Sequence, residues 1–221
     1  MEVVQIRGLS VDYGKYPVIQ DFSLSVEEGE AVLIKGPSGC GKSTLLHAVC
    51  GLIPGSIRAN IVGEILISGQ KVLNMRAAER AREIGIVFQN PETQLFCDSV
   101  EDEIAFGLEN VCVPTYEIEK RIDEVLALVG MNEYRYASPK ELSGGQKQRV
   151  VLAAVLALDP KLLLLDEALS QMDVSGRENL ITYLKKLRKQ GRTMIMVDHD
   201  DYLVEIASFV VEMNNLWEVP L

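Results

Sequence analysis

Residues 36–44 read GPSGCGKST and combine glycines, a lysine and hydroxyl side chains at a spacing that suits phosphate binding. The stretch matches the pattern G-x-x-x-x-G-K-[ST] and lies between a predicted strand, 31–35, and a predicted helix from Lys42 to about Leu52. The glycines let the backbone curl so that successive N–H groups converge on phosphate oxygens at a helix start. A glycine-rich turn with an ordinary lysine is the alternative, but spacing and context favour a nucleoside triphosphate.

The residues of this phosphate loop (36–44) have different expected tasks. Lys42 should reach the β- and γ-phosphates and is also a candidate catalytic residue. Ser43 should ligate Mg²⁺, and Thr44 could donate to an α-phosphate. The other expected nucleotide contacts are Gly36, Pro37, Ser38, Gly39, Cys40 and Gly41.

Two adjacent carboxylates, Asp166 and Glu167, directly follow four leucines at 162–165. Such an apolar run is typical of a strand buried in a parallel sheet, so both side chains should lie at the carboxyl edge, where α/β proteins bind ligands. Because successive side chains of a strand point to opposite faces, the two should have different tasks. Asp166 suits the oxygen shell of Mg²⁺, and Glu167 would orient or deprotonate an attacking water. Carboxylates merely solvated at a strand end are the alternative.

Residues 142–149, LSGGQKQR, place a serine and two glycines directly before a predicted helix, 146–158. A helix start presents unpaired N–H groups and the positive end of the helix dipole, so an anion is one candidate occupant. A serine-capped helix with glycine in the preceding loop is the other interpretation. This stretch alone leaves both open. The residues concerned are Ser143, Gly144, Gly145 and Gln146.

Alternating strands and helices would position these candidate sites. The other predicted strands are Val3–Arg7, Ser23–Val26, Ile61–Ser68, Ile84–Phe88 and Thr193–Val197. A predicted helix at 174–189 and a short closing helix and strand complete the pattern, which indicates an α/β fold around a parallel sheet. We expect a single unit, 1–221, with a helical subdomain at about 89–158 inserted between core segments 1–88 and 159–221.

Composition narrows the class of protein further. The 221 residues are 48% hydrophobic, enough for one substantial core with a subdomain. A formal net charge of -10 argues against non-specific binding to nucleic acid or anionic lipid, although a local basic patch could still bind phosphate. Cys40, Cys50, Cys97 and Cys112 show no metal-binding spacing and are expected to be reduced. Neither a signal peptide nor a spanning helix is expected.

The order of these motifs resembles that of the ATP-binding cassette ATPases, over nearly the whole chain. The most specific feature is LSGGQ, 142–146, between the phosphate loop and the acidic pair. The resemblance implies ATP and Mg²⁺ as cofactors and an α/β fold. That fold has a RecA-like P-loop NTPase core with a parallel sheet, an antiparallel β subdomain and an inserted α-helical subdomain. It also implies a homo- or heterodimer with a second cassette subunit, in which the LSGGQ segment contacts the γ-phosphate held by the partner.

The resemblance implies further site residues. Tyr13, in VDYGK, matches the aromatic residue that stacks on adenine; Tyr16 is a nearby competitor, and a half-buried strand tyrosine is the alternative. Gln89 matches the residue that links Mg²⁺ and the attacking water to the helical subdomain. His199, in MVDHDD, matches the histidine that contacts the γ-phosphate, whereas His47 is expected to be structural.

Asp173 matches the aspartate that couples the two nucleotide sites across the dimer, but its surroundings depart from the family pattern. The segment reads ALSQMDV, where the family commonly has a Pro- or Ala-Thr-Ser start and a proline after the aspartate. The geometry between the sites is therefore expected to differ. The glutamate of the acidic pair, Glu167, is present, which indicates a hydrolysing site.

Residues 88–110, FQNPETQLFCDSVEDEIAFGLEN, resemble the ATPase subunits of energy-coupling-factor transporters, which import vitamins and transition-metal ions. In the family this stretch docks the membrane partner, and Leu95 and Phe96 are candidates for an exposed apolar patch. Packing of both inside the helical subdomain is the alternative. We expect a transmembrane subunit to dock near Gln89–Asn110, with the chain peripheral at the cytoplasmic face of the membrane.

Other classes of protein fit less well. A soluble cassette ATPase acting on nucleic acid or the ribosome usually carries a long coiled-coil insertion, or two cassettes joined by a basic linker, and the sequence shows neither. A P-loop kinase would leave LSGGQ unexplained. The ATPase of another class of ABC transporter is the main alternative. Membrane subunits would select the transported substrate, so this chain does not encode it.

Overall fold

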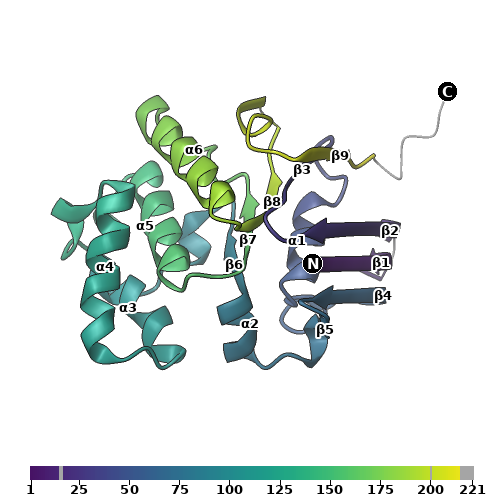
Figure 1. Ribbon diagram of the computed structural model, residues 1–221, viewed down its shortest axis with the longest axis horizontal. Coiled ribbons are helices and arrows are strands. Elements are labelled where there is room, and N and C mark those ends of the chain that lie inside the picture. Colours follow the sequence, from purple (N-terminus) through teal and green to yellow (C-terminus); the bar gives the residue numbers. More distant parts are fainter. Residues whose placement is uncertain (15–16, 200, 215–221) are drawn as a thin grey trace.

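The described chain, residues 1–14, 17–199 and 201–214 of a computed structural model, folds into two β-sheets and a group of helices (Figure 1). The strands are β1 Glu2–Asp12, β2 Pro17–Glu27, β3 Ala31–Lys35, β4 Asn60–Ile67, β5 Gln70–Lys71, β6 Ile84–Val87, β7 Leu162–Asp166, β8 Thr193–Val197 and β9 Phe209–Glu212. The α-helices are α1 Lys42–Val49, α2 Ala77–Glu83, α3 Val100–Asn110, α4 Thr115–Val129, α5 Gly144–Ala157 and α6 Val174–Lys189. Short 3₁₀ helices are η1 Val72–Asn74, η2 Pro91–Thr93, η3 Asn132–Tyr134, η4 Pro139–Glu141 and η5 Asp201–Leu203.

One sheet is antiparallel, with strand order β2-β1-β4-β5, and the other is parallel, with order β6-β7-β8-β3-β9. Figure 1 shows the antiparallel sheet at one side of the molecule, α3 and α4 at the opposite side, and the parallel sheet between them. The parallel sheet, the antiparallel sheet and the group of helices confirm the predicted fold class.

The central strands of the parallel sheet are buried on both faces. All five residues of β7 and all five of β8 are buried. Leu162 and Leu164 belong to the apolar cluster shared with α1 and the antiparallel sheet, whereas Leu163 and Leu165 belong to the cluster shared with α6. Burial on both faces explains why these strands are continuous apolar runs. It also fixes the carboxyl end of β7, where the acidic pair lies.

The helices α3, α4 and α5 pack around a third apolar cluster. The buried residues of α4 recur at three- and four-residue intervals, as expected for a helix with one apolar face. They are Ile118, Ile122, Val125 and Leu126. No helix in the described part of the chain is long and apolar enough to cross a bilayer.

Several element boundaries differ from the predicted ones. Helix α1 ends at Val49 instead of near Leu52, because the N–H groups of Gly51 and Leu52 turn back onto the carbonyls of Ala48 and His47. Helix α5 begins at Gly144, two residues earlier than predicted, and β6 ends one residue earlier, at Val87. The antiparallel strands β1 and β2 are longer than predicted, and α2 was not predicted at all.

Candidate functional site

The turn between β3 and α1 has a backbone shape that only glycine permits at its first position. Gly36 has a φ of 151°, and a Cβ atom there would lie 2.2 Å from Met213 O. The last two residues of the turn, Cys40 and Gly41, are buried. The residues exposed at its rim are Pro37, Ser38 and Gly39. The rim therefore presents backbone to solvent, as an anion-binding turn requires.

Lys42 begins α1, and its ammonium group lies within this turn. The residue is only 5% exposed, and Nζ donates to Gly36 O at 2.8 Å and to Pro37 O at 3.0 Å. A buried charge is costly unless hydrogen bonds compensate it. The two carbonyls hold a positive charge at the centre of the phosphate loop, beside the half-buried Ser43 and Thr44.

Tyr13 lies next to the start of α1. It follows the last residue of β1, its hydroxyl lies 3.3 Å from Thr44 Oγ1, and the residue is 46% exposed. The exposed ring is therefore open to a planar ligand beside the phosphate loop. The competitor Tyr16 lies outside the described residues.

Asp166 ends β7 and faces the first turn of α1. The residue is only 4% exposed, and among the described residues its Oδ1 is buried without a hydrogen-bond partner. Burial raises the pKa of this carboxyl, and a hydrogen bond from the Ser43 hydroxyl only partly offsets that effect. An unpaired buried carboxylate oxygen beside a serine hydroxyl fits a hard divalent cation such as Mg²⁺, which prefers oxygen ligands.

Glu167 directly follows the last residue of β7. Its φ is 47°, in the left-handed region, and its N–H donates to Val197 O at 2.9 Å. Its carboxylate accepts from Gln89 Nε2 at 2.5 Å and lies 2.9 Å from His199 Nε2. The two carboxylates have different partners, Ser43 for Asp166 and the pair Gln89 and His199 for Glu167. Residues from three separate loops therefore meet at one carboxylate.

His47 of α1 packs against an aromatic ring. Its imidazole meets Phe88 edge-on, with ring centroids 5.3 Å apart. Burial lowers the pKa of His47, although the nearby charge of Asp166 acts against that effect. These contacts agree with the structural role expected for it.

The LSGGQ segment forms the start of α5. Ser143 Oγ accepts from Gln146 N at 3.4 Å, and Gln146 Oε1 accepts from Ser143 N at 2.8 Å, so the serine-capped helix is present. A Cβ atom on Gly145 would lie 2.8 Å from Gln171 O, so the close approach of that segment requires glycine here. Ser143 and Gly144 are exposed. Within the described residues, the capping bonds of Ser143 and Gln146 do not involve residues 36–44.

Asp173 caps the start of α6. Its Oδ1 accepts from Gly176 N at 3.2 Å, and Val174 begins the helix where the family pattern commonly has a proline. The preceding residues Ala168, Leu169 and Met172 are buried, whereas Ser170 and Gln171 are exposed next to α5. The segment that connects Glu167 to α6 is thus held by buried apolar side chains and exposes Ser170 and Gln171 to solvent.

Comparison with known proteins decides the family. The family model described as ABC transporter matches residues 19–170. The chain belongs to this family. Over 209 residues it is 42% identical to the energy-coupling factor transporter ATP-binding protein EcfA1 of Streptococcus pneumoniae, covering 93% of this chain and 74% of that protein. The predicted resemblance to cassette ATPases of the energy-coupling-factor type is confirmed.

Solved cassette structures share the fold. One is cbiO1 from Clostridium perfringens, part of the ABC transporter complex cbiONQ, with a TM-score of 0.80, 31% identity and coverage of 96% of this chain and 84% of that chain. Another is a dimeric ATP-binding cassette bound to ADP and Pi, with a TM-score of 0.83, 27% identity and coverage of 95% and 94%. Two curated relatives from Methanosarcina mazei and Methanosarcina acetivorans are 42% and 43% identical, but the cassette spans only 36% and 32% of their lengths.

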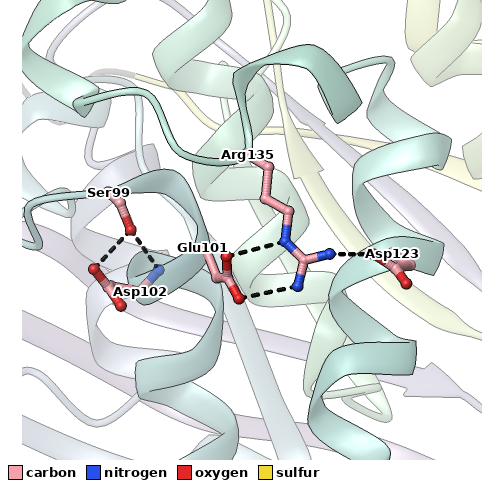
Figure 2. Close-up of polar contacts among 5 residues, drawn as sticks. All are labelled: Ser99, Glu101, Asp102, Asp123 and Arg135. Carbon is pink, nitrogen blue, oxygen red and sulfur yellow. Dashed lines mark hydrogen bonds and ion pairs between the residues drawn. The ribbon is translucent and has the colours of Figure 1, made fainter.

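Helix α3 of the cassette is tied to the segment that leads to α5. Arg135 donates to both carboxylate oxygens of Glu101 at 3.0 and 2.9 Å, and to Asp123 of α4 at 2.7 Å (Figure 2). The backbone N–H of Glu101 donates to Arg135 O at 2.9 Å. Ser99 caps the same helix, and its Oγ accepts from Asp102 N at 3.1 Å (Figure 2). The hydrogen bonds with Glu101 raise the pKa of Arg135, so its side chain stays charged. The contacts of Arg135 with Glu101 and Asp123 are called the Arg135 clamp below.

The stretch predicted to dock a membrane partner is partly apolar and exposed. Phe96 is 65% exposed and Phe106 is 46% exposed, and their rings meet edge-on with centroids 4.7 Å apart. A hollow of about 150 Å³ borders both rings and reaches the apolar face of α5. Leu95 instead packs against two of the apolar clusters. The docking interpretation thus suits Phe96, and the packing alternative suits Leu95.

Sequence reasoning missed three polar residues whose side chains join separate elements of the fold. They are Arg135, Gln148 and Gln171. Each of them forms hydrogen bonds with residues far away in the sequence. For example, Gln148 Nε2 donates to Phe88 O at 3.2 Å. No local sequence signal singles out Gln148, because it lies in the polar run 146–149, although the structure buries it in α5.

Proposed function

We propose that this cassette is the ATP-hydrolysing subunit that powers a membrane importer of the energy-coupling-factor type. The observation that carries hydrolysis is the Glu167 carboxylate, which contacts Gln89 and His199 at the edge of the sheet that also presents the phosphate loop. The transporter class rests on the 42% identity to a protein named as an energy-coupling factor transporter subunit.

The phosphate loop would hold ATP with Mg²⁺. Lys42 would neutralise the β- and γ-phosphates, and Ser43, Asp166 and Gln89 offer oxygen atoms suited to Mg²⁺. When bound there, Mg²⁺ would neutralise charge that develops on the phosphates. Tyr13 would stack on adenine. The remaining contacts would come from Gly36, Pro37, Ser38, Gly39, Cys40, Gly41 and Thr44.

Glu167 would take the proton of the attacking water. Gln89 and His199 fix both oxygens of its carboxylate, so the group is oriented before any substrate is bound. Gln89 would orient the water, and His199 would contact the γ-phosphate. These three residues and Lys42 form the proposed catalytic set.

A second cassette, identical or related, would complete each nucleotide site. Ser143, Gly144, Gly145 and Gln146 lie at an outward-facing helix start with exposed backbone, which suits a γ-phosphate held by the partner subunit. Asp173 would couple the two sites. The dimeric relative bound to ADP and Pi supports this arrangement by similarity.

A transmembrane subunit would dock near Gln89–Asn110, over the exposed Phe96 and Phe106. The Arg135 clamp would pass a displacement of α3 to the LSGGQ segment. The cassette would be peripheral at the cytoplasmic face of the membrane and bind no nucleic acid.

We also propose the predicted division into core segments 1–88 and 159–221 and a helical subdomain at about 89–158. The same site would serve another class of ABC transporter. Co-purification from membranes with a hydrophobic subunit would separate a transporter ATPase from a soluble cassette ATPase.

The proposed phosphate loop is tested by Lys42→Ala. Loss of the charge that neutralises the phosphates should lower ATP turnover at least about 10²-fold. Phosphate release is measured with saturating ATP and Mg²⁺, with and without a candidate partner cassette. The matched control is Lys120→Ala, at a lysine whose side chain is 77% exposed on α4, which should keep the unmutated rate. Near-normal turnover by Lys42→Ala would remove the phosphate loop from the proposal.

A further inference from the structure

Phe88, the residue before Gln89, is fixed by glutamine side chains on both of its backbone groups. Strand β6 ends at Val87, so the strand ladder no longer holds this residue. Gln94 Oε1 accepts from Phe88 N at 2.8 Å. Gln148 Nε2, from α5, donates to Phe88 O at 3.2 Å. The peptide plane from which Gln89 projects is therefore set by side chains instead of by strand pairing.

Gln148 is an unusual choice for its position if packing were its only task. The residue is 1% exposed, and within the described chain its Oε1 is buried without a hydrogen-bond partner. A buried polar atom without a partner destabilises a fold, whereas an apolar side chain of the same shape would not. Methionine has similar length and would fill this space without that cost. Stability alone therefore does not account for the amide.

Further contacts tie the loop that begins at Phe88 to α5 and to the segment before Asp173. Gln171 Nε2 donates to Gln89 O at 3.4 Å, and Lys147 Nζ pairs with Glu92 Oε1 at 2.6 Å. These residues line a polar hollow of about 440 Å³ next to Gly144. The loop that carries Gln89 is thus connected to the start of the LSGGQ helix by two successive residues of α5.

We propose that Gln148 is a positioning residue that fixes Gln89 against Glu167, with Gln94 and Gln171 in support. This inference rests on the proposed function, because Gln89 and Glu167 act in hydrolysis there. Since Gln148 lies one turn into the LSGGQ helix, its bond to Phe88 O joins that helix to the residue before Gln89. Gln148 touches neither nucleotide nor water itself, and it acts through the backbone of Phe88.

The test is Gln148→Met, which removes the donor and the unpaired acceptor together. We expect the urea midpoint of unfolding to change little, because removal of the unpaired buried acceptor offsets the loss of the bond to Phe88 O. Backbone amides in a peptide spanning 86–96 should exchange with solvent about tenfold faster, while peptides covering 36–49 should not change. The kcat for ATP should fall about tenfold at unchanged KM, because misplacement of a positioned group affects the chemical step. In a Gln89→Ala background, Gln148→Met should have no further effect on kcat.

Gln190→Met, at an exposed glutamine just after α6, is the matched control and should leave exchange and kcat as they are. If Gln148→Met fails to fold, Gln171→Leu at an exposed position takes its place, with faster exchange at 86–96 expected. Unchanged exchange and kcat would overturn the inference, as would an equal loss of kcat in the Gln89→Ala background. If the unmutated cassette hydrolyses no ATP with any partner, the proposed function fails, and the exchange result still decides this inference.

Discussion

The backbone of Glu167 is the strained point of the candidate site. A φ of 47° is uncommon for a residue with a side chain and costs of order 1–3 kcal/mol. The surrounding structure enforces it, because Glu167 N is bonded to Val197 O and both oxygens of its carboxylate are held. The two adjacent carboxylates lie in different surroundings, Asp166 beside Ser43 and Glu167 between Gln89 and His199.

At the scale of single residues, the reactivity of the cysteines is predicted to depend on pH. Burial and the neighbouring charge of Glu103 both disfavour a thiolate at Cys97, and they raise its pKa to about 11. Burial likewise raises the pKa of Cys50 to about 11. At pH 8 the thiolate fraction of either should be of order 10⁻³, rising tenfold with each pH unit until about pH 11.

The exposed Cys112 should therefore react first with iodoacetamide at pH 8, at least about tenfold faster than Cys97. Peptide mass spectrometry over a time course measures the order of labelling. Equal rates at Cys97 and Cys112 would show that the environment of Cys97 does not suppress its thiolate.

At the scale of elements, the Arg135 clamp joins α3, α4 and the segment before α5. Arg135→Ala removes charge-assisted hydrogen bonds to Glu101 and Asp123 and leaves the largely buried Glu101 without its partner. We expect the free energy of unfolding to fall by about 1–3 kcal/mol. Urea denaturation followed by circular dichroism measures the change.

Arg76→Ala provides the comparison, because Arg76 pairs with Glu79 on α2 but its side chain is 84% exposed. Exposed pairs contribute little, so the loss should be below about 1 kcal/mol. If the two variants were equally stable, Arg135 would not hold these elements together.

Elements were predictable where burial imposes a sequence pattern. The buried strands β3 and β8 begin and end as predicted, because each is a short apolar run between turn residues. Helix α2 escaped prediction because none of its residues is buried, so it has no apolar periodicity. Strand β1 continues past Arg7 because its pairing resumes after a register shift, and Gly8 interrupts the strand pattern there.

From the residues alone, candidate site residues could be proposed where the chemistry is encoded locally, whereas Gln89 and His199 came from the family resemblance. GPSGCGKST and the acidic pair are contiguous, so one sequence sufficed to single out Lys42, Asp166 and Glu167. The bonds of Arg135 to Glu101 and of Gln148 to Phe88 span 34 and 60 positions. No periodicity or spacing within a single sequence records such pairings, because the packing of separate elements creates them.

At the scale of the whole molecule, the phosphate loop and the LSGGQ segment belong to different parts of the fold. The first follows a strand of the parallel sheet, and the second begins a helix that packs with α3 and α4. In the proposed dimer, ATP would bridge the phosphate loop of one cassette and the LSGGQ segment of the other. A nucleotide that binds only the paired state stabilises it by mass action. ATP should therefore favour association, and hydrolysis should end it.

Glu167→Gln tests this arrangement, because the amide keeps the size of the side chain but cannot take a proton. Hydrolysis should fall at least about 10²-fold while Lys42, Ser43 and Asp166 still hold ATP with Mg²⁺. Adding Ser143→Arg to the same variant supplies the control, since it should prevent pairing and leave ATP binding by the single chain intact.

The deciding measurement is the molar mass of Glu167→Gln by light scattering, with ATP and Mg²⁺ and with or without a candidate partner cassette. We predict a mass equal to two cassettes when ATP and Mg²⁺ are present, and a return to single chains when Ser143→Arg is added. The account is contradicted if ATP leaves the mass unchanged under all these conditions and the variant hydrolyses ATP at the unmutated rate. Such a result would speak against a nucleotide site shared between two cassettes.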